Sequence, residues 1–271
     1  MVTALDGGNL ETGIYREYQS GALRIAATLE ARPQADRLTV ILNGYCYRGK
    51  EQPPVFAQWP SSDDVPGHVL RVCDPTLFLS DWLKGSSFIG TEADDPIPAI
   101  VKVSKEIARD LGANSTRVLY VGHSGAGYGA LQCAILDDHS VGIGINPLVE
   151  LGAYTRYTFG TKTVQSFRAG ASLAELCRDY PRRFSVTNAL KHAFETGKEP
   201  RLGLIQNVLD KTHFFPHYGA CCEALGIPIS GGPDAPGRCH SLTYEKTGGH
   251  SALPELPTFR QMVKRMLPDG G

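Results

Sequence analysis

Residues 118–131 read VLYVGHSGAGYGAL, and the character of the sequence changes sharply in the middle of this run. Its first residues are β-branched, aromatic and apolar, which is typical of a buried strand. Its later residues are small and apolar and are compatible with a helix. Between the two halves, Ser124 is surrounded by glycine and alanine. Only very small neighbours permit a sharp, strained turn from strand to helix, so the stretch predicts that the Ser124 hydroxyl projects from such a turn as a nucleophile.

The turn departs slightly from the usual pattern G-x-S-x-G. Ala126 stands where the last glycine is expected, and Gly127 follows it. Alanine still keeps the turn tight, so the departure is mild. A phosphate-binding loop would carry G-x-x-x-x-G-K-[ST], but this stretch has no lysine, and the dinucleotide pattern G-x-G-x-x-G is not met either. A tight turn without a catalytic role remains the alternative.

Short apolar runs alternate with helix-compatible stretches along the chain. The expected strands are residues 14–18, 23–29, 38–42, 68–72, 117–121, 141–145, 201–208 and 238–244. Besides the helix after Ser124, the expected helices are residues 99–111, 173–178, 186–194, 217–225 and 257–266. This alternation predicts the α/β class, with a mostly parallel central sheet and helices on both faces. We expect one domain over residues 1–271, with a helical cap inserted at 148–200.

A nucleophilic serine needs a general base, and histidine is the usual one. His250 lies in KTGGHS, residues 246–251, after the last expected strand and before the last expected helix. When a nucleophile sits on a strand-to-helix turn of this kind, the acid and then the histidine follow it along the chain. We therefore predict His250 as the base. The alternatives are His213, His217 and His240.

The acid that orients the histidine should end the strand before it. Asp210 ends the apolar run NVLD and is the predicted acid, which would orient and stabilise the protonated imidazole. The alternatives are that Asp210 only caps a turn, or that Asp234 in GGPDAPG takes its place. His213 and His217 are four residues apart, but no carboxylate or cysteine completes a clear set, so we predict no metal.

Two backbone amides are needed to stabilise an oxyanion. The first is predicted at Gly125, directly after the serine, and the second at Gly44 or Tyr45, after the expected strand 38–42. Four further side chains are candidates for contact with the substrate: Tyr47, Arg48, His123 and Tyr128. Surface exposure is the alternative for the first two. A second unusual strand end, Asp74-Pro75, is favoured as a structural turn, with a pocket wall as the alternative.

Composition excludes several classes of protein. The net charge of −1 gives no excess of positive charge of the kind that binds nucleic acid or an anionic membrane. No run approaches 18 apolar residues, and the N-terminus has no signal-peptide pattern. The 7 cysteines form no zinc pattern and are expected to be reduced thiols. We therefore expect a cytoplasmic protein without a membrane span or a cofactor, and the oligomeric state is not predicted.

Several short motifs resemble those of α/β-hydrolase proteins associated with bacterial surface glycans. They are Asn43-Gly44, PPVFA at 53–57, DPTL at 74–77, IGT at 89–91, GHSGAGYGAL at 122–131 and INP at 145–147. The chain is similar in this respect to the glycan O-acetyltransferases of accessory secretion systems and to capsule-linked hydrolases. The resemblance spans roughly residues 43–250. It implies a triad of Ser124, Asp210 and His250, and acyl transfer to or from a carbohydrate hydroxyl.

Three functions follow as hypotheses. The first is a serine-dependent acyl-ester hydrolase that works through an acyl-enzyme, with a small-molecule or glycan ester as substrate. The second is an O-acyltransferase that moves the acyl group to a sugar or glycan hydroxyl. The third is a non-catalytic binding protein on the same fold. The sequence identifies neither the acyl group nor the acceptor.

Overall fold

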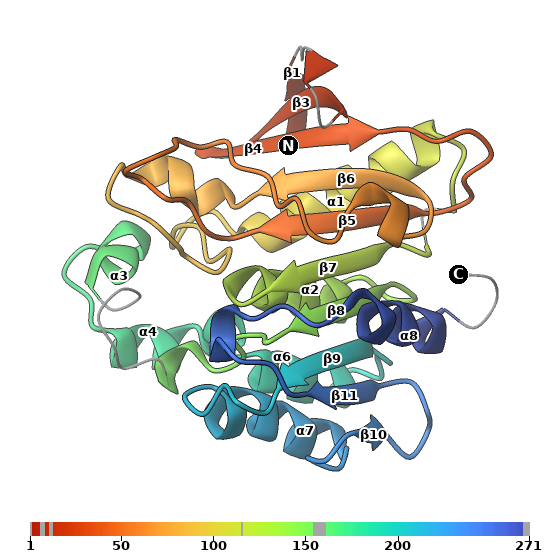
Figure 1. Ribbon diagram of the computed structural model, residues 1–271. Helices are drawn as coiled ribbons and strands as arrows, with labels where there is room; N and C mark the ends of the chain where they lie inside the picture. The colour runs from red at the N-terminus through yellow and green to blue at the C-terminus, as the bar shows by residue number, and fades with distance from the viewer. Residues whose placement is uncertain (1, 6–8, 11–12, 115, 154–160, 268–271) are drawn as a thin grey trace.

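One large β-sheet forms the centre of the molecule (Figure 1). The computed structural model describes residues 2–5, 9–10, 13–114, 116–153 and 161–267. Strands β6, β5, β7, β8, β9 and β11 lie side by side in this order and are parallel, and antiparallel strands extend both edges. The strands are β1 (Val2–Leu5), β2 (Asn9–Leu10), β3 (Gly13–Ser20), β4 (Leu23–Glu30), β5 (Leu38–Asn43), β6 (His68–Cys73), β7 (Leu119–His123), β8 (Val141–Ile145), β9 (Arg201–Asn207), β10 (Gly232–Pro233) and β11 (His240–Tyr244).

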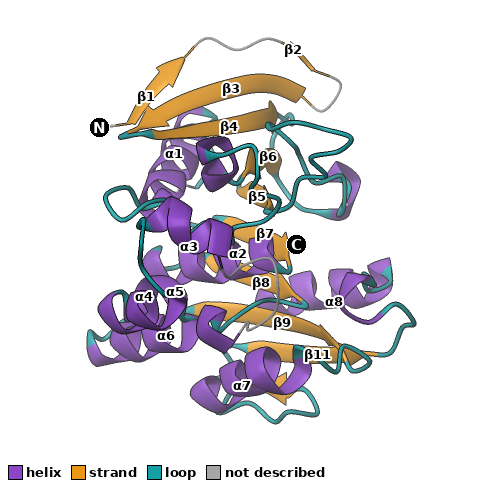
Figure 2. Ribbon diagram, turned by 90° about the vertical axis from the view of Figure 1, so that its left-hand side faces the viewer, coloured by secondary structure: helices purple, strands orange, loops and turns teal. Residues whose placement is uncertain are grey.

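Helices cover both faces of the sheet (Figure 2). The helices are α1 (Pro96–Asp110), α2 (Gly125–Leu136), α3 (Thr161–Phe167), α4 (Leu173–Asp179), α5 (Pro181–Phe184), α6 (Val186–Glu195), α7 (Ala220–Leu225) and α8 (Leu256–Met266). Helix α8 lies on one face, while α1, α2 and α6 lie on the other. The predicted α/β class and the order of its elements are therefore confirmed.

The parallel strands have an apolar core on each side because alternate residues of a strand point to opposite faces. Tyr120 of β7 packs in the core under α1 and α2, whereas Leu119 and Val121 pack under α8. Both faces are buried, so the strand reads as a continuous apolar run in the sequence. This is why residues 117–121 could be predicted as a strand without an alternating pattern.

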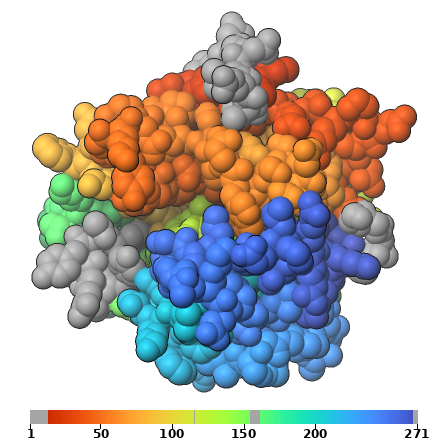
Figure 3. Space-filling view, viewed as in Figure 1, coloured from red at the N-terminus to blue at the C-terminus, as the bar shows by residue number. Residues whose placement is uncertain are grey.

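Helix α8 meets the segment between β5 and β6 on its face of the sheet. In Figure 3 the two appear as neighbouring blue and orange surfaces. Arg260 of α8 forms an ion pair with Asp64 at 2.8 Å, and the rings of Phe259 and Trp59 lie 5.2 Å apart. These contacts hold Trp59 beside the carboxyl ends of the strands.

The turn between β7 and α2 has the strained backbone that the sequence predicts. Ser124 has φ 56° and ψ −122°, a conformation that L-residues rarely adopt. A Cβ atom on Gly122 would lie 2.1 Å from the carbonyl oxygen of Ala126, so the strand and the helix cross too closely for any side chain. Ala126 itself is buried and is accommodated in place of the expected glycine.

We expect Gly122→Ala to destabilise the fold by about 3 kcal/mol or more, because the new methyl group overlaps backbone rather than a movable side chain. Urea unfolding followed by circular dichroism measures this. Gly49→Ala is the matched control, since a Cβ atom on Gly49 would have no other atom within 4 Å, and it should change stability by less than about 0.5 kcal/mol. Equal midpoints for the two variants would contradict the close crossing.

The predicted cap region contains helices α3, α4, α5 and α6 and a short 3-10 helix, Leu151–Ala153. Residues 154–160 of this region lie outside the described residues. The helices expected at 173–178 and 186–194 are confirmed as α4 and α6. Helix α6 packs against α2, so the C-terminal part of this region covers the same face of the sheet as α1.

Covalent cross-links and membrane helices are both absent from the described part of the chain. All 7 cysteines lie within it as free thiols, and only Cys177 is not fully buried. Among the helices within residues 2–267 that the structure describes, none combines the length and the apolar character needed to cross a bilayer.

Candidate active site

Three side chains from different parts of the chain meet at the carboxyl ends of the parallel strands. Ser124 lies between β7 and α2, Asp210 follows β9, and His250 lies in a 3-10 helix, Gly249–Ser251, after β11. The Nε2 atom of His250 is 2.7 Å from the Ser124 Oγ, and its Nδ1 is 2.7 Å from the Asp210 Oδ2. A carboxylate only accepts hydrogen bonds, so Nδ1 donates and Nε2 is left to accept from the serine. The structure thus brings the three predicted residues together.

Asp210 holds a second imidazole as well. The Nδ1 atom of His213 lies 2.8 Å from the Asp210 Oδ1, and the His213 ring is centred 4.1 Å from the His250 ring. Burial alone would raise the pKa of Asp210, but the hydrogen bonds from His213 and His250 outweigh it and keep the pKa well below its usual range. Asp210 is therefore ionised whenever His250 needs it as an acceptor.

The alternative histidines occupy other positions. His213 contacts the acid rather than the serine. His217 accepts hydrogen bonds at Nδ1 from the backbone amides of Val149 and Glu150, both at 3.1 Å, and burial lowers its pKa to about 3. It therefore acts as a neutral anchor for the segment after β8. His240 lies within β11, as expected for a structural residue.

The atoms of Asp210, His213 and His250 that could bind a metal ion lie within 4.8 Å of one another. Hydrogen bonds already account for this arrangement, because each carboxylate oxygen accepts from a different imidazole. A metal would have to replace both of these protons. Both carboxylate oxygens of Asp210 therefore already have an imidazole partner in this arrangement.

Two buried asparagines, which sequence reasoning missed, hold the segment that carries His250. Asn146 donates from Nδ2 to the backbone carbonyls of His250 and Ala252, both at 3.0 Å. Asn207 donates from Nδ2 to the carbonyls of Lys246 and Gly249, both at 2.8 Å. A hydrogen bond also joins the two asparagines: the backbone N–H of Asn207 donates to the Asn146 Oδ1 at 2.8 Å. Both follow or end a parallel strand, so the sheet itself fixes the position of His250.

Asn207→Leu should lower kcat for ester hydrolysis by about 100-fold with little change in KM, because a shift of His250 by about 1 Å misaligns proton transfer without blocking the pocket. Steady-state kinetics with p-nitrophenyl acetate measure both constants. Asn188→Leu, at an exposed position of α6, is the matched control and should behave like the wild-type protein. If Asn207→Leu lowers folding stability but leaves kcat unchanged, Asn207 does not position the base.

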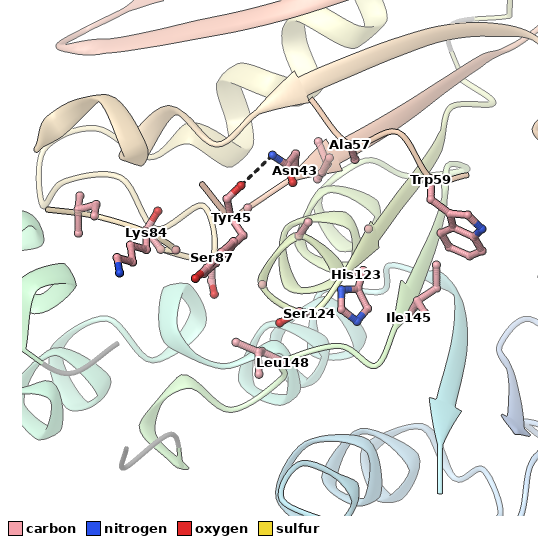
Figure 4. Close-up of a pocket in the computed structure, with 18 of the residues that line it drawn as sticks. Asn43, Tyr45, Ala57, Trp59, Lys84, Ser87, His123, Ser124, Ile145 and Leu148 are labelled. Atoms are coloured by element: carbon pink, nitrogen blue, oxygen red, sulfur yellow. Dashed lines mark hydrogen bonds between the residues drawn. The ribbon is translucent and has the colours of Figure 1, made fainter. Parts of the chain in front are cut away.

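A pocket of about 580 Å³ opens over Ser124. Figure 4 shows Ser124 and His123 at its floor, with Tyr45 and Ser87 on one side and Leu148 on another. The rim includes four further residues: Trp59, Trp82, Lys84 and Lys162. The volume is sufficient for a small organic ligand.

The two predicted oxyanion positions lie next to each other in this pocket. A Cβ atom on Gly44 would be 3.0 Å from the amide nitrogen of Ala126, so the loop after β5 rests against the first turn of α2. Gly44, Tyr45 and Gly125 all line the pocket. Among the described residues, no acceptor is found for the amide hydrogens of Tyr45 and Gly125. This placement supports the prediction that these two backbone amides stabilise the oxyanion.

A buried loop that sequence reasoning missed closes this side of the pocket. Ser86 and Ser87 line it, and a Cβ atom on Gly125 would lie 2.8 Å from the Ser87 Oγ. Asp74 holds the loop by accepting from the Ser86 Oγ at 2.7 Å and the Phe88 amide at 2.8 Å. Asp74 is fully buried, so it is the structural residue that the sequence favoured and not a pocket wall.

Three of the four predicted substrate contacts are not placed in the pocket. Tyr47 is 61% exposed outside it. Arg48 donates to the carbonyls of Leu83 at 2.7 Å and Ser80 at 2.9 Å, which ties two loops together. Tyr128 is buried because it lies one helical turn beyond Ser124, where α2 faces the core, and its hydroxyl donates to the Arg183 carbonyl at 2.9 Å. The predictions for these residues are corrected to structural or surface positions.

His123 is the one of the four that lines the pocket. Its Nε2 donates to the backbone carbonyl of His250 at 2.8 Å. Burial, and after it the neighbouring His250, lowers the pKa of His123 to about 4, so the ring is neutral near pH 7. His123 thus supports the same loop as Asn146 while forming part of the floor.

The chain is similar in structure to several known proteins, whereas the two sequence comparisons find no match. No protein-family model and no curated protein sequence matches the chain. The capsule O-acetyltransferase of Neisseria meningitidis serogroup A is similar with a TM-score of 0.62, 14% identity and 97% coverage of both chains. The glycosylation-associated Gap123 complex of Streptococcus agalactiae gives 0.63 at 14% identity, over 98% of this chain and 46% of the other. An acetyl xylan esterase from Paenibacillus sp. R4 gives 0.58 at 13% identity, over 99% and 87%. Together with the parallel sheet and the serine turn between β7 and α2, these likenesses show that the chain has the α/β-hydrolase fold.

Proposed function

We propose that this protein is a serine-dependent acyl-ester hydrolase. The observation that carries the proposal is the continuous set of hydrogen bonds from Ser124 through His250 to Asp210, with both distances at 2.7 Å, beneath an open pocket. Nucleophile, base and orienting acid are the three groups that acyl transfer needs. The strained backbone of Ser124 supports the same role, since strain of this kind gathers at functional positions.

The proposed reaction has two steps. The Ser124 Oγ attacks the ester carbonyl while its proton passes to Nε2 of His250, and the oxyanion binds the amides of Gly125 and Tyr45. The intermediate collapses, the C–O bond to the alcohol breaks, and His250 gives its proton to the leaving oxygen. Water then attacks the acyl-serine, loses a proton to His250 and releases the acid and the free Ser124.

The rim of the pocket suits an O-acylated carbohydrate. Trp82 is 71% exposed and Tyr45 is 48% exposed, so two exposed aromatic side chains line the pocket, and the Lys162 ammonium lies 4.8 Å from the centre of the Trp82 ring. Aromatic rings offer an apolar face that a sugar ring can pack against. Leu148, Thr161 and Lys162 of the region 148–200 also line the pocket, which supports the role of this region as a cap that selects the substrate. The acetyl xylan esterase named above is a structural relative whose name includes such a substrate.

A panel of p-nitrophenyl esters of increasing acyl length tests the proposal. The wild-type protein should hydrolyse at least one short-chain ester, with Ser124→Ala showing only the uncatalysed rate. The same panel is repeated with acetylated xylo-oligosaccharides, and released acetate is measured. Hydrolysis of the esters by Ser124→Ala at the wild-type rate would end the proposal.

An O-acyltransferase is the second candidate. Its supporting observation is the likeness to the capsule O-acetyltransferase over 97% of both chains. Transfer differs from hydrolysis only in the second step, where a sugar hydroxyl rather than water attacks the acyl-serine. Sugar acceptors added to the ester panel therefore separate the two: a transferase increases the rate of p-nitrophenol release and forms an acylated sugar, whereas a hydrolase releases the free acid at an unchanged rate.

A further inference from the structure

A second pocket lies at the edge of the sheet opposite Ser124. In Figure 1 the arrowheads of β5, β7 and β9 point to the edge that carries the active site, and this pocket lies at their other ends. Its volume is about 360 Å³. Arg37 directly precedes β5, Arg117 lies two residues before β7, and Arg201 begins β9. Strands β5, β7, β8 and β9 are neighbours in the sheet, so their starts bring these arginines together.

The pocket is strongly basic. The charged side chains among its described lining residues are Arg37, Arg117 and Arg201, and His139 adds an imidazole. Within the described parts of the chain, no carboxylate lines the pocket. Like charges that line one pocket repel one another, and an anion between them would relieve that repulsion.

Arg37 is the most deeply buried of these three arginines. Its side chain is only 4% exposed, yet among the described residues its one acidic contact is the neighbouring Asp36, from Nε at 3.4 Å, and that carboxylate is 80% exposed. No acceptor for the two terminal nitrogens of Arg37 is found in the described structure. The terminal nitrogens of Arg37 are not among the buried side-chain atoms that lack a partner, so they reach solvent in the pocket, where they can donate to a bound anion.

The other residues offer further donors rather than acceptors. Arg201 uses one terminal nitrogen to donate to the Met266 carbonyl at 2.8 Å, and Arg117 has no ion pair within the described structure. The Asn114 Oδ1 is occupied by the amide and hydroxyl of Thr116, at 2.9 and 2.7 Å, which leaves its Nδ2 to donate. Forked guanidinium groups fit the oxygens of phosphate better than they fit a spherical ion.

We propose that this pocket binds a multiply charged oxyanion, namely phosphate or the phosphoryl group of a phosphate ester. The ligand sits between Arg37, Arg117 and Arg201, and its negative charge balances a wall on which the described structure places no carboxylate. The site is separated from Ser124 by the length of the strands, so it is a binding site in addition to the proposed active site.

Isothermal titration calorimetry of the full chain tests this at constant ionic strength. Inorganic phosphate, pyrophosphate and phenyl phosphate are the probes, and sodium chloride is the reference; the comparison separates the free anion from an ester. We expect one site per chain and a submillimolar Kd for at least one phosphate probe. The double variant Arg117→Gln/Arg201→Gln should weaken that Kd at least 10-fold. Arg109→Gln, at an exposed position of α1, is the matched control and should leave it unchanged.

Results of two kinds would overturn the proposal. One is the lack of binding for every phosphate probe, or equal binding by the wild-type protein and a correctly folded double variant. The other concerns residues 268–271, which include Asp269 and follow Leu267 at the pocket wall. If phosphate binds to Asp269→Asn but not to the wild-type protein, the Asp269 carboxylate is the ligand of the arginines and no external phosphate is required.

Discussion

His250→Ala is expected to lower kcat/KM for p-nitrophenyl acetate by about 10⁴-fold or more, because removal of a catalytic base from a triad costs nearly as much as removal of the whole triad. Without the imidazole, the Ser124 hydroxyl keeps its proton and attacks poorly. His250 is 2.7 Å from that hydroxyl, and no other imidazole of the described structure contacts it. Rates with the purified variant, compared at equal folded fraction, measure the loss.

Two further histidine variants sharpen this result. His192→Ala, at an exposed position of α6, should keep the wild-type rate. His213→Ala removes a hydrogen bond to Asp210 rather than to the serine, so its loss should be smaller than that of His250→Ala by at least about 10-fold. If His213→Ala is the more damaging of the two, the base has been assigned to the wrong histidine.

Asp210→Asn should lower kcat/KM by about 10⁴-fold, although the side chain keeps its size. The amide no longer presents a charged acceptor to Nδ1, so His250 loses the tautomer in which Nε2 accepts the Ser124 proton. The loss of the negative charge also destabilises the imidazolium that forms during attack. Steady-state kinetics measure the rate, and near-wild-type values would show that Asp210 merely caps a turn.

The same variant changes the acid sensitivity of folding. The hydrogen bonds from His213 and His250 lower the pKa of Asp210 in the folded state below its unfolded value, although burial opposes them. The ionised Asp210 carboxylate therefore stabilises the fold fully above about pH 4, the ordinary pKa of an aspartate in the unfolded chain. This contribution is lost as the pH falls toward the lower pKa of Asp210 in the folded state. The stability difference between wild type and Asp210→Asn, measured by urea unfolding, should shrink below that pH.

The parts of the site that could be predicted from the sequence are those fixed by local chemistry. Gly122 and Ser124 indicate a strand-to-helix turn because no larger neighbours fit there. Asp210 and His250 could be found because parallel strands deliver the residues at their carboxyl ends to one edge of the sheet. In each case the signal was an apolar run followed directly by a polar residue or a glycine turn.

The parts that could not be predicted depend on the direction of side chains in three dimensions. Tyr128 is close to Ser124 in the sequence, but one turn of α2 carries it into the core. Arg48 bonds carbonyls about 30 residues away along the chain, as its contacts with Ser80 and Leu83 require. The asparagine pair Asn146 and Asn207 acts on backbone carbonyls, which leave no trace in the residue types of the segment they hold.

Labelling with a fluorophosphonate probe, followed by mass spectrometry of the labelled peptide, tests the nucleophile most directly. We predict that wild-type protein is labelled once, on Ser124, that Ser124→Ala is not labelled and that His250→Ala is labelled far more slowly. Such a result also separates an enzyme from a binding protein that only shares the fold. Labelling of Ser124→Ala to the wild-type extent, or a wild-type protein that never reacts, would contradict the account.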